Sequence, residues 1–245
     1  MIKLTQIEKA FGEQIIFRGI DLEVRDGDNL FIVGGSGTGK SVLIKLILGL
    51  EKQDWGTVEI DGQNTLDFSR SEWQEVLSQF GVVFQGAALF DSLNVLENVG
   101  IKLYEAKSHH PKQIRSLVIE ALEQVNLSES VLKKYPSELS GGMRKRVGIA
   151  RAIIQNPRYL IYDEPTTGLD PASSDVIDEL IGSLGSYRKR TSVVITHDMT
   201  SVHSLADRVI MINQGLIQFD GSQKEFFSSE DPIIDAFLAR TRRHS

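Results

Sequence analysis

Apolar and polar positions change their period along this chain, and the changes predict where strands and helices lie. The first part, residues 1–85, is typical of strands, because its apolar runs are short or alternate with polar residues. One helix is expected within it, directly after Lys40, where apolar residues recur over Val42–Leu48. The expected strands lie near 2–8, 19–25, 29–33, 57–61 and 80–84.

From about 86 to 157 the pattern becomes almost entirely helical. Pro111 opens an amphipathic stretch in which apolar residues recur at i, i+3, i+4 and i+7, and Pro is favoured at the first position of a helix. A second helix is expected from about Ser140. The apolar stripes are Ile114, Leu117, Val118, Ala121, Leu122 and Val125 on the first helix, and Met143, Val147, Ala150 and Ile154 on the second.

Strands return after residue 157, at 159–162, 191–195 and 208–212, with helical patterns between them. This alternation predicts a parallel α/β sheet. Gln214-Gly215 between two apolar runs indicates a hairpin turn. The stretch from about 222 to 245 is expected to be helical and then polar. The fold class predicted is therefore α/β, interrupted by a helical insertion.

Composition narrows the class of protein. The 245 residues are 41% hydrophobic and 24% charged, which is ordinary for a globular protein with a substantial core. The net charge of −6 provides no global field that would attract nucleic acid, and no nucleic-acid partner is expected. There are no cysteines, which suits a reducing compartment. No apolar run approaches the roughly 18 residues of a membrane span, so a partner would have to supply any membrane part.

A phosphate-binding loop is the most informative feature of the chain. The apolar run Leu30–Val33 leads into Gly34-Gly35-Ser36-Gly37-Thr38-Gly39-Lys40-Ser41, which has the spacing G-x-x-x-x-G-K-S. Glycines let backbone N–H groups turn toward phosphate oxygens, and the following helix directs its positive end at the same charge. Lys40 is expected to reach the β- and γ-phosphates and Ser41 to ligate Mg²⁺. The sequence therefore predicts binding of a nucleoside triphosphate.

Two adjacent carboxylates end the apolar run Tyr159–Tyr162. In a parallel sheet, ligands gather at the carboxyl ends of strands, so Asp163 and Glu164 should arrive near the phosphates. We expect Asp163 to help hold Mg²⁺ and Glu164 to orient or deprotonate an attacking water. Taken alone, such a pair is as compatible with a solvated turn; the phosphate loop upstream favours the catalytic interpretation.

Two further segments add candidate phosphate contacts. Thr196-His197-Asp198 ends the next apolar strand, where His197 could donate to the γ-phosphate or simply be an exposed histidine. Ser140-Gly141-Gly142 opens a helix with Ser140 as a natural N-cap, which makes a second anion-binding helix start. Two such starts in one chain are most simply reconciled by a head-to-tail dimer, in which Ser140 and Gly142 of one copy close over the nucleotide of the other.

These motifs stand in the order found in the nucleotide-binding domain of ABC transporters, and residues 2–220 resemble that family. The resemblance implies a P-loop ATPase of ABC type, with a RecA-like mixed sheet, an antiparallel β part and an inserted helical subdomain at about 86–157. It also implies an ATPase domain at 1–220 and a C-terminal helical tail at 221–245, with ATP and Mg²⁺ as cofactors.

The resemblance also implies roles for individual residues. Phe11 is placed where an aromatic ring stacks on adenine, Gln85 where it links Mg²⁺ and the attacking water to the permease contact, and Asp170 at the dimer contact. Met143 departs from the commoner Gln. The implied catalytic residues are Lys40, Gln85, Glu164 and His197; the metal ligands are Ser41, Gln85 and Asp163; the nucleotide-binding residues are Phe11, Gly34, Gly35, Ser36, Gly37, Thr38, Gly39, Lys40, Ser41, Ser140, Gly141, Gly142, Asp170 and Thr196.

Two strings, Phe84–Val95 and Gly142–Val147, are similar to the ATPase of Mla and MCE-type lipid transporters. This similarity implies a homodimer at the cytoplasmic face of the inner membrane, bound peripherally to a transmembrane permease. It further implies an MCE-domain lipid-binding protein and a small cytoplasmic adaptor. The alternatives are a tight turn with no lipid meaning at 86–88, and an importer of a polar solute such as an amino acid.

A non-transport ABC ATPase of DNA repair, chromosome structure or translation is disfavoured, since the chain has no cysteines, no heptad tract and one phosphate loop. The basic run Arg144-Lys145-Arg146 is interpreted as a solvated helix face, and the alternative is a surface that faces anionic lipid head groups or a partner. The arginines Arg240, Arg242 and Arg243 could contact a second subunit, an adaptor or the membrane, or lie in a frayed end.

Overall fold

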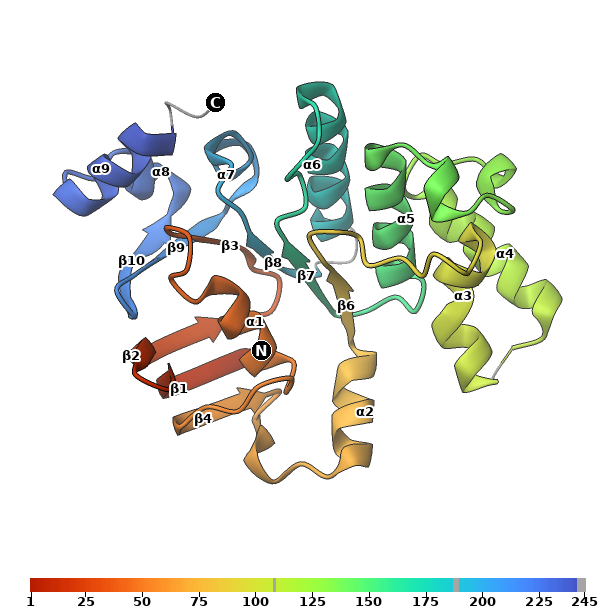
Figure 1. Ribbon diagram of the computed structural model, residues 1–245. Coiled ribbons are helices and arrows are strands. Elements are labelled where there is room, and N and C mark those ends of the chain that lie inside the picture. The colour runs from red at the N-terminus through yellow and green to blue at the C-terminus, as the bar shows by residue number, and fades with distance from the viewer. Residues whose placement is uncertain (108, 187–189, 242–245) are drawn as a thin grey trace. The chain divides into compact units, whose positions relative to one another are not determined.

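The computed structural model of this chain describes residues 1–107, 109–186 and 190–241 (Figure 1). It forms two compact units, one built from Met1–Leu77 and Lys189–Ser245 and the other from Ser78–Arg188. The second unit is thus inserted in the sequence of the first, and the chain passes between them twice.

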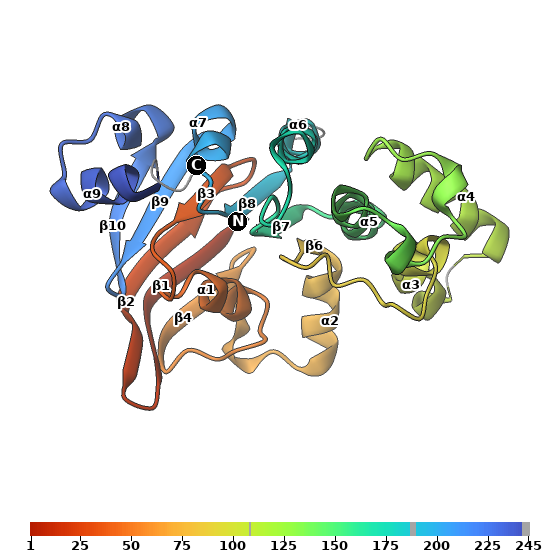
Figure 2. The same cartoon turned by 45° about the horizontal axis from the view of Figure 1, so that its top comes forward.

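An antiparallel sheet begins the first unit. Its strands are β1 (Ile2–Phe11), β2 (Gln14–Val24), β4 (Trp55–Ile60) and β5 (Gln63–Asn64), in the order β2-β1-β4-β5 (Figure 2). Burial alternates along β1, where Ile2, Leu4 and Ile7 are buried and the residues between them are exposed or half-buried. Alternation is the pattern of a sheet that covers a core with one face.

Parallel strands form the other sheet of the first unit. β3 (Asn29–Val33) lies between β8 (Thr191–Ile195) and β9 (Arg208–Asn213), parallel to both, and β10 (Leu216–Ser222) returns antiparallel to β9. β8 is buried throughout and β3 from its second residue, as expected of strands covered on both faces. The predicted hairpin is confirmed at Gln214-Gly215, where both residues have positive φ, 48° and 80°.

Short helices follow these strands. α1 (Lys40–Ile47) follows β3 and α7 (Met199–Leu205) follows β8. The end of the chain is helical as predicted, with α8 (Gln223–Phe227) and α9 (Pro232–Thr241). Arg240 is exposed on α9, whereas Arg242 and Arg243 lie outside the described residues.

The second unit carries the predicted helical insertion. β6 (Phe80–Val83) pairs in parallel with β7 (Tyr159–Asp163). Between them in sequence come α3 (Val95–Ala106), α4 (Pro111–Glu123) and α5 (Gly141–Ile153), which pack on one another, with the short 3-10 turns Glu129–Val131 and Pro136–Glu138. α6 (Pro171–Ser186) follows β7.

One helix departs from the sequence prediction. Residues 1–85 were expected to hold a single helix, but α2 (Arg70–Ser78) and the 3-10 turn Thr65–Asp67 also lie there. The pattern of apolar residues does not indicate this helix, because Val76 is the one residue that α2 buries. Its start is held locally instead, by Glu72 accepting from the Ser69 amide at 2.7 Å. In the part of the chain that the structure describes, no helix is long and apolar enough to cross a membrane.

Candidate functional site

The phosphate loop connects β3 to α1 in the first unit. The Lys40 ammonium lies back on the loop and donates to the carbonyl oxygens of Gly34 and Gly35 at 2.8 and 2.9 Å. The Thr38 hydroxyl donates to the Gly35 carbonyl at 3.0 Å, which tightens the turn. Ser41 is exposed in the first turn of α1. The loop therefore wraps around the one lysine that the sequence assigned to the phosphates.

Two glycines of the loop are required by the backbone path. Gly34 has φ +149°, and a Cβ there would collide with the Ile212 carbonyl oxygen of β9. Gly39 has φ +99°, and a Cβ would lie 2.6 Å from Cγ2 of Ile16 and 2.9 Å from the Phe17 ring. Both φ values disfavour any residue with a side chain. The start of α1 can therefore approach β2 and β9 only with glycine at these positions.

The end of β8 lies beside the end of β3. The pairing of Ile32 with Ile195 is followed by a bond of 3.4 Å from the Thr196 amide to the Ile32 carbonyl. Thr196 is buried, and its hydroxyl accepts from the Asp198 amide at 3.0 Å. His197 is exposed between them. This register places His197 at the same sheet edge as the phosphate loop.

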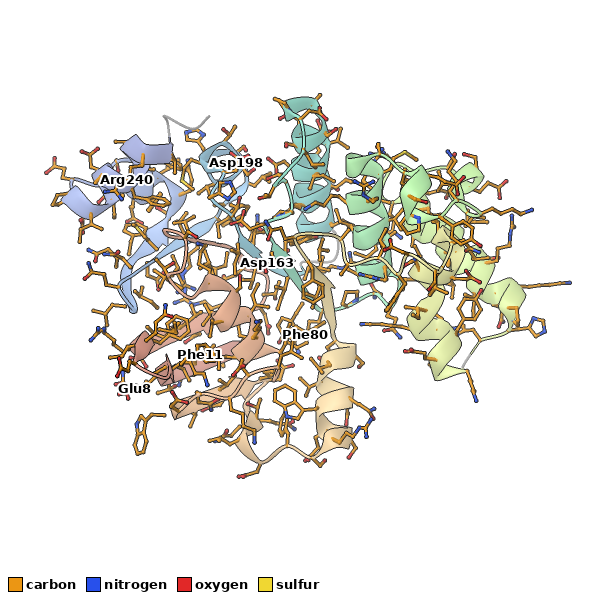
Figure 3. The ribbon with its side chains drawn as sticks, viewed as in Figure 1. Glu8, Phe11, Phe80, Asp163, Asp198 and Arg240 are labelled. Atoms are coloured by element: carbon orange, nitrogen blue, oxygen red, sulfur yellow. The ribbon has the colours of Figure 1, made fainter. Side chains whose placement is uncertain are left out.

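Asp198 closes the same turn by capping α7 (Figure 3). Its carboxylate accepts from the Thr200 amide at 2.9 Å, which satisfies one of the free N–H groups of the helix start. The cap fixes the segment that carries His197, so the imidazole is presented from an ordered turn.

Phe11 ends β1 and is 44% exposed, also in the first unit (Figure 3). The Lys9 ammonium lies 4.8 Å from the centroid of the Phe11 ring, a cation–π distance. Lys9 itself is buried and bonds the Lys52 carbonyl at 2.7 Å. A ring held in this way, with part of its surface open, suits the stacking role that the family resemblance implies for Phe11.

The second unit brings together the ends of β6 and β7. The register pairs Val83 with Tyr162, so the residues that follow, including Gln85 and Glu164, leave the two strands at the same edge. Asp163 is the last residue of β7 (Figure 3) and is half-buried with Glu164. Glu164 has φ 51°, and its Oε2 accepts from the Thr167 hydroxyl at 3.0 Å. A hydroxyl donor and a left-handed backbone thus fix where this carboxylate points.

The serine–glycine helix start is confirmed at the N-terminus of α5. Ser140 is the N-cap, and its Oγ accepts from the Met143 amide at 3.2 Å. A Cβ on Gly141 would lie 3.3 Å from the Leu169 side chain, and one on Gly142 would lie 3.3 Å from the Ser173 hydroxyl. The two glycines therefore let the segment after β7 pack closely on the start of α5.

Asp170 belongs to that packed segment. Its carboxylate accepts from the amide and the hydroxyl of Ser173, at 3.0 and 2.7 Å, and so caps α6. The hydroxyl bond, followed by the amide bond, lowers the pKa of Asp170. The structure thus gives Asp170 a helix-capping contact within its own chain, beside the dimer contact implied by the family.

Lys145 is the functional candidate that the sequence missed. The interpretation of Arg144-Lys145-Arg146 as a solvated face is wrong for Lys145, which is 6% exposed, whereas Arg144 is exposed and Arg146 half-buried. The Lys145 ammonium donates to the main-chain oxygens of Gln85 and, at 3.2 Å, Glu164. Burial lowers its pKa, and the charges of Glu164 and Asp163 oppose that shift. The sequence carries no local signal for this burial, because the bonding partners of Lys145 lie 60 and 19 residues away.

The residues present fit a magnesium nucleotide. Ser41, Gln85 and Asp163 offer hydroxyl, amide and carboxylate oxygens, the hard donors that Mg²⁺ prefers. Among the described residues no three His, Cys, Asp or Glu side chains cluster as a metal site. Mg²⁺ is commonly bound with few carboxylates, water and substrate phosphates, in keeping with this donor set.

Comparison with known proteins identifies the family. Residues 17–167 match the model of the ABC transporter family. This chain belongs to the ABC transporter family. It is the ATPase subunit of such a transporter and hydrolyses ATP in coupling to transport. The expected fold, an ABC ATPase with parallel and antiparallel sheets and a helical insertion, is confirmed.

The names of the relatives of this ABC ATPase refer to different compounds. Protein TRIGALACTOSYLDIACYLGLYCEROL 3, chloroplastic, of Arabidopsis thaliana is 40% identical over 97% of this chain and 73% of its own length. The methionine import ATP-binding protein MetN of Bartonella henselae is 37% identical over 98% of this chain and 69% of its own. A solved dimer of the ATP-binding cassette MJ0796 with ADP and Pi has TM-score 0.83 and 32% identity, covering 91% of this chain and 99% of that one.

Proposed function

We propose that this ABC ATPase energises the transport of lipid, in particular phospholipid, across or between bacterial membranes through a separate permease. The observation that carries the proposal is its 40% identity, over nearly the whole chain, to a plant protein named for the glycolipid trigalactosyldiacylglycerol. The resemblance of Phe84–Val95 and Gly142–Val147 to lipid-transport ATPases supports the same class of substrate.

The first unit is proposed to hold the nucleotide. Loop amides of residues 34–39 and the Lys40 ammonium would bind the β- and γ-phosphates, with the positive end of α1 directed at the same oxygens. Ser41 would be a ligand of Mg²⁺, which when bound offsets the negative charge of the phosphates. Phe11 would stack on adenine, and His197 would donate to the γ-phosphate from the end of β8.

The second unit is proposed to supply the hydrolytic groups. Glu164 would orient and deprotonate the attacking water, and the Thr167 bond to its Oε2 holds the carboxylate in place for this task. Asp163 and the side chain of Gln85 would complete the ligands of the metal. The developing charge of the transition state would be met by Lys40 and backbone N–H groups.

A second copy of the chain is proposed to close each site. Ser140, Gly141 and Gly142 at the start of α5 would approach the γ-phosphate bound by the other copy, with Asp170 at the dimer contact. Support comes from the position of Ser140 as the N-cap of α5, since helix N-termini favour anions, and from the solved dimer of a cassette that is 32% identical.

The remaining proposed partners are a transmembrane permease, a lipid-binding protein and an adaptor. Phe84 and Phe90, 39% and 50% exposed, flank the turn after Gln85 and would meet cytoplasmic helices of the permease. We further propose an MCE-domain lipid-binding protein and a small cytoplasmic adaptor. The complex would hold this ATPase peripherally at the cytoplasmic face of the inner membrane.

Import of a polar solute is the competing function. A methionine importer subunit is 37% identical over 98% of this chain, a difference of three percentage points from the plant relative. The turn at residues 86–88 also has a packing explanation, because Ala87 is buried against Gly148.

A pull-down separates the two functions. The tagged full chain, expressed at its native level, is recovered from gently solubilised membranes, and proteins and lipids are identified by mass spectrometry. Lipid transport predicts a multi-span permease with an MCE-domain protein and phospholipid. A permease recovered with a solute-binding protein would replace lipid by polar-solute import, and recovery of no membrane protein would contradict the proposed complex.

A further inference from the structure

Three residues of α5 lie against the turn that follows β6 in the second unit. Lys145, Gly148 and Arg151 are spaced three apart, so they lie along one side of the helix. The Lys145 ammonium bonds the Gln85 carbonyl. Arg151 donates from its two terminal nitrogens to the carbonyls of Ala87 and Ala88, each at 2.7 Å. A Cβ on Gly148 would lie 3.1 Å from Cβ of Ala87, so glycine lets the turn reach the helix.

The turn needs these contacts because its backbone is strained. Ala87 and Ala88 have φ values of 60° and 47°, a left-handed conformation that costs a non-glycine residue about 1 kcal/mol or more. Ala87 is 1% exposed. Charged donors make the stronger class of hydrogen bond to the turn's carbonyls. Helix α5 therefore determines the path of the chain immediately after Gln85.

Lys145 reaches beyond the turn to the neighbouring strand. Its ammonium also donates to the Glu164 carbonyl at 3.2 Å, so one cation holds the main chain at the ends of β6 and β7. Glu164 has a left-handed backbone of its own, at φ 51°. A bond to its carbonyl constrains the backbone from which the side chain extends, and the Thr167 hydroxyl bonds the carboxylate itself. Lys145 thus constrains the main chain of both the carboxylate and the glutamine expected at the attacking water.

We propose that Lys145 is a positioning residue for ATP hydrolysis, acting from the serine–glycine helix on Gln85 and Glu164 together. This inference rests on the proposed roles of those two residues. Because the described contacts of Lys145 end on main-chain oxygens, its contribution to turnover is one of geometry. A movement of α5 on dimer closure would then be transmitted by Lys145 both to Glu164 and to the turn that is proposed to face the permease.

The test is the steady-state ATP hydrolysis of the full chain, with the membrane subunits that co-purify with it. Lys145→Met keeps the aliphatic stem and removes the donor. We expect kcat to fall about 10- to 100-fold, the scale of a displaced catalytic group, with KM and ATP affinity changed less than about twofold. Arg146→Met is the matched control: it removes a neighbouring cation whose guanidinium bonds the Asn126 carbonyl at 2.9 Å, and its kcat should stay unchanged.

A double-mutant cycle distinguishes positioning from general stabilisation. In a Glu164→Gln background, Lys145→Met should cause a much smaller further loss of kcat than it causes in the wild-type protein, because residues acting through one another are non-additive. Full additivity of the two losses, or a wild-type kcat in Lys145→Met, would overturn the proposal. If Glu164→Gln itself retains wild-type hydrolysis, the proposed base is wrong, which is a different failure.

A milder variant guards against misfolding. Lys145→Gln retains a neutral N–H donor on a side chain that is one bond shorter than that of lysine. The kcat of each variant is expressed per nucleotide-binding site, so that unfolded protein does not lower it. We expect a loss of a few fold at unchanged KM, smaller than that of Lys145→Met. If Lys145→Met does not fold, a wild-type kcat in Lys145→Gln overturns the proposal.

Discussion

The side chain of the half-buried Glu164 is held by a hydroxyl and its backbone by an ammonium. Thr167 donates to its Oε2 at 3.0 Å, and Lys145 bonds its carbonyl. Such restraint is expected of a group that must act on water at a defined position. A substitution at Glu164 is therefore the most direct test of the proposed hydrolysis.

Glu164→Gln should slow ATP turnover by orders of magnitude, because an amide cannot accept the proton of the attacking water. ATP binding should remain near wild-type, since the change is isosteric. Hydrolysis and equilibrium nucleotide binding are measured on the same preparation. Glu179→Gln, the same change at an exposed site of α6, is the control and should behave as wild-type. Rapid hydrolysis by the Glu164 variant would remove this residue from the role of base.

Gly39→Ala should reduce thermal stability more than Gly37→Ala. Both positions have positive φ, 99° and 76°, so both changes carry the strain of a left-handed alanine. Only at Gly39 does the new Cβ collide with neighbours, at 2.6 Å from Ile16, whereas nothing lies within 4 Å at Gly37. The comparison of unfolding temperatures isolates the collision. Equal losses in the two variants would contradict the packing of α1 on β2.

At the scale of elements, a buried asparagine of α3 holds the segment that follows the turn after β6 (residues 85–88, the 85–88 turn). Asn98 is fully buried, and its Oδ1 accepts from the Phe90 amide at 2.8 Å. Its Nδ2 donates to the carbonyls of Phe90, Leu93 and Asn94 at 3.0, 2.8 and 3.1 Å. One side chain thus bonds main-chain groups of Phe90, Leu93 and Asn94.

Asn98→Ala should lower the free energy of unfolding by about 2–4 kcal/mol, because it leaves several buried backbone groups without their partner. Chemical denaturation measures this loss, and hydrogen exchange should show faster opening confined first to residues 90–94. Gln124→Ala, at an exposed position beyond α4, should change stability by less than about 0.5 kcal/mol. A loss at Asn98 no larger than this control would contradict the role of the side chain.

Elements were predictable from the sequence wherever one periodic pattern decided them. The apolar runs of β3, β7 and β8, the phosphate loop and the helix after Pro111 all fall where expected. α2 was missed because it buries little, so its pattern is polar. Lys145 was misjudged because its partners lie 60 and 19 residues away, and burial of a charge through such contacts leaves no local periodicity. The roles of individual site residues stay predictions.

At the scale of the molecule, the proposed chemistry is divided between the two units. The phosphate loop and His197 belong to the first, and Gln85, Ser140 and Glu164 belong to the second. The chain passes between the units twice, so the inserted unit can carry both the hydrolytic groups and the helix start proposed to meet another copy. Dimer formation is therefore the whole-molecule property to test.

Ser140→Arg should block ATP-dependent dimerisation while leaving nucleotide binding intact. The added side chain would occupy the space before α5 and repel the close approach of another copy, and the lost cap costs about 1 kcal/mol locally. Light scattering of the Glu164→Gln protein with and without ATP provides the readout. Ser116→Arg, which adds the same charge at an exposed site of α4, is the control and should still dimerise. Dimers formed equally well by the Ser140 variant would argue against the proposed interface.

The contacts between α5 and the 85–88 turn end on main-chain oxygens, and this has a consequence for how the protein can diversify. Carbonyl groups are the same whatever side chain a residue carries, so exposed positions of the turn, such as Gln85 and Ala88, make these bonds without using their own side chains. A library that randomises Phe84, Ala88 and Phe90 should therefore retain many folded, ATP-binding members. The side chains presented to a membrane partner can therefore vary in sequence while the bonds from Lys145 and Arg151 to the carbonyls of the turn are kept.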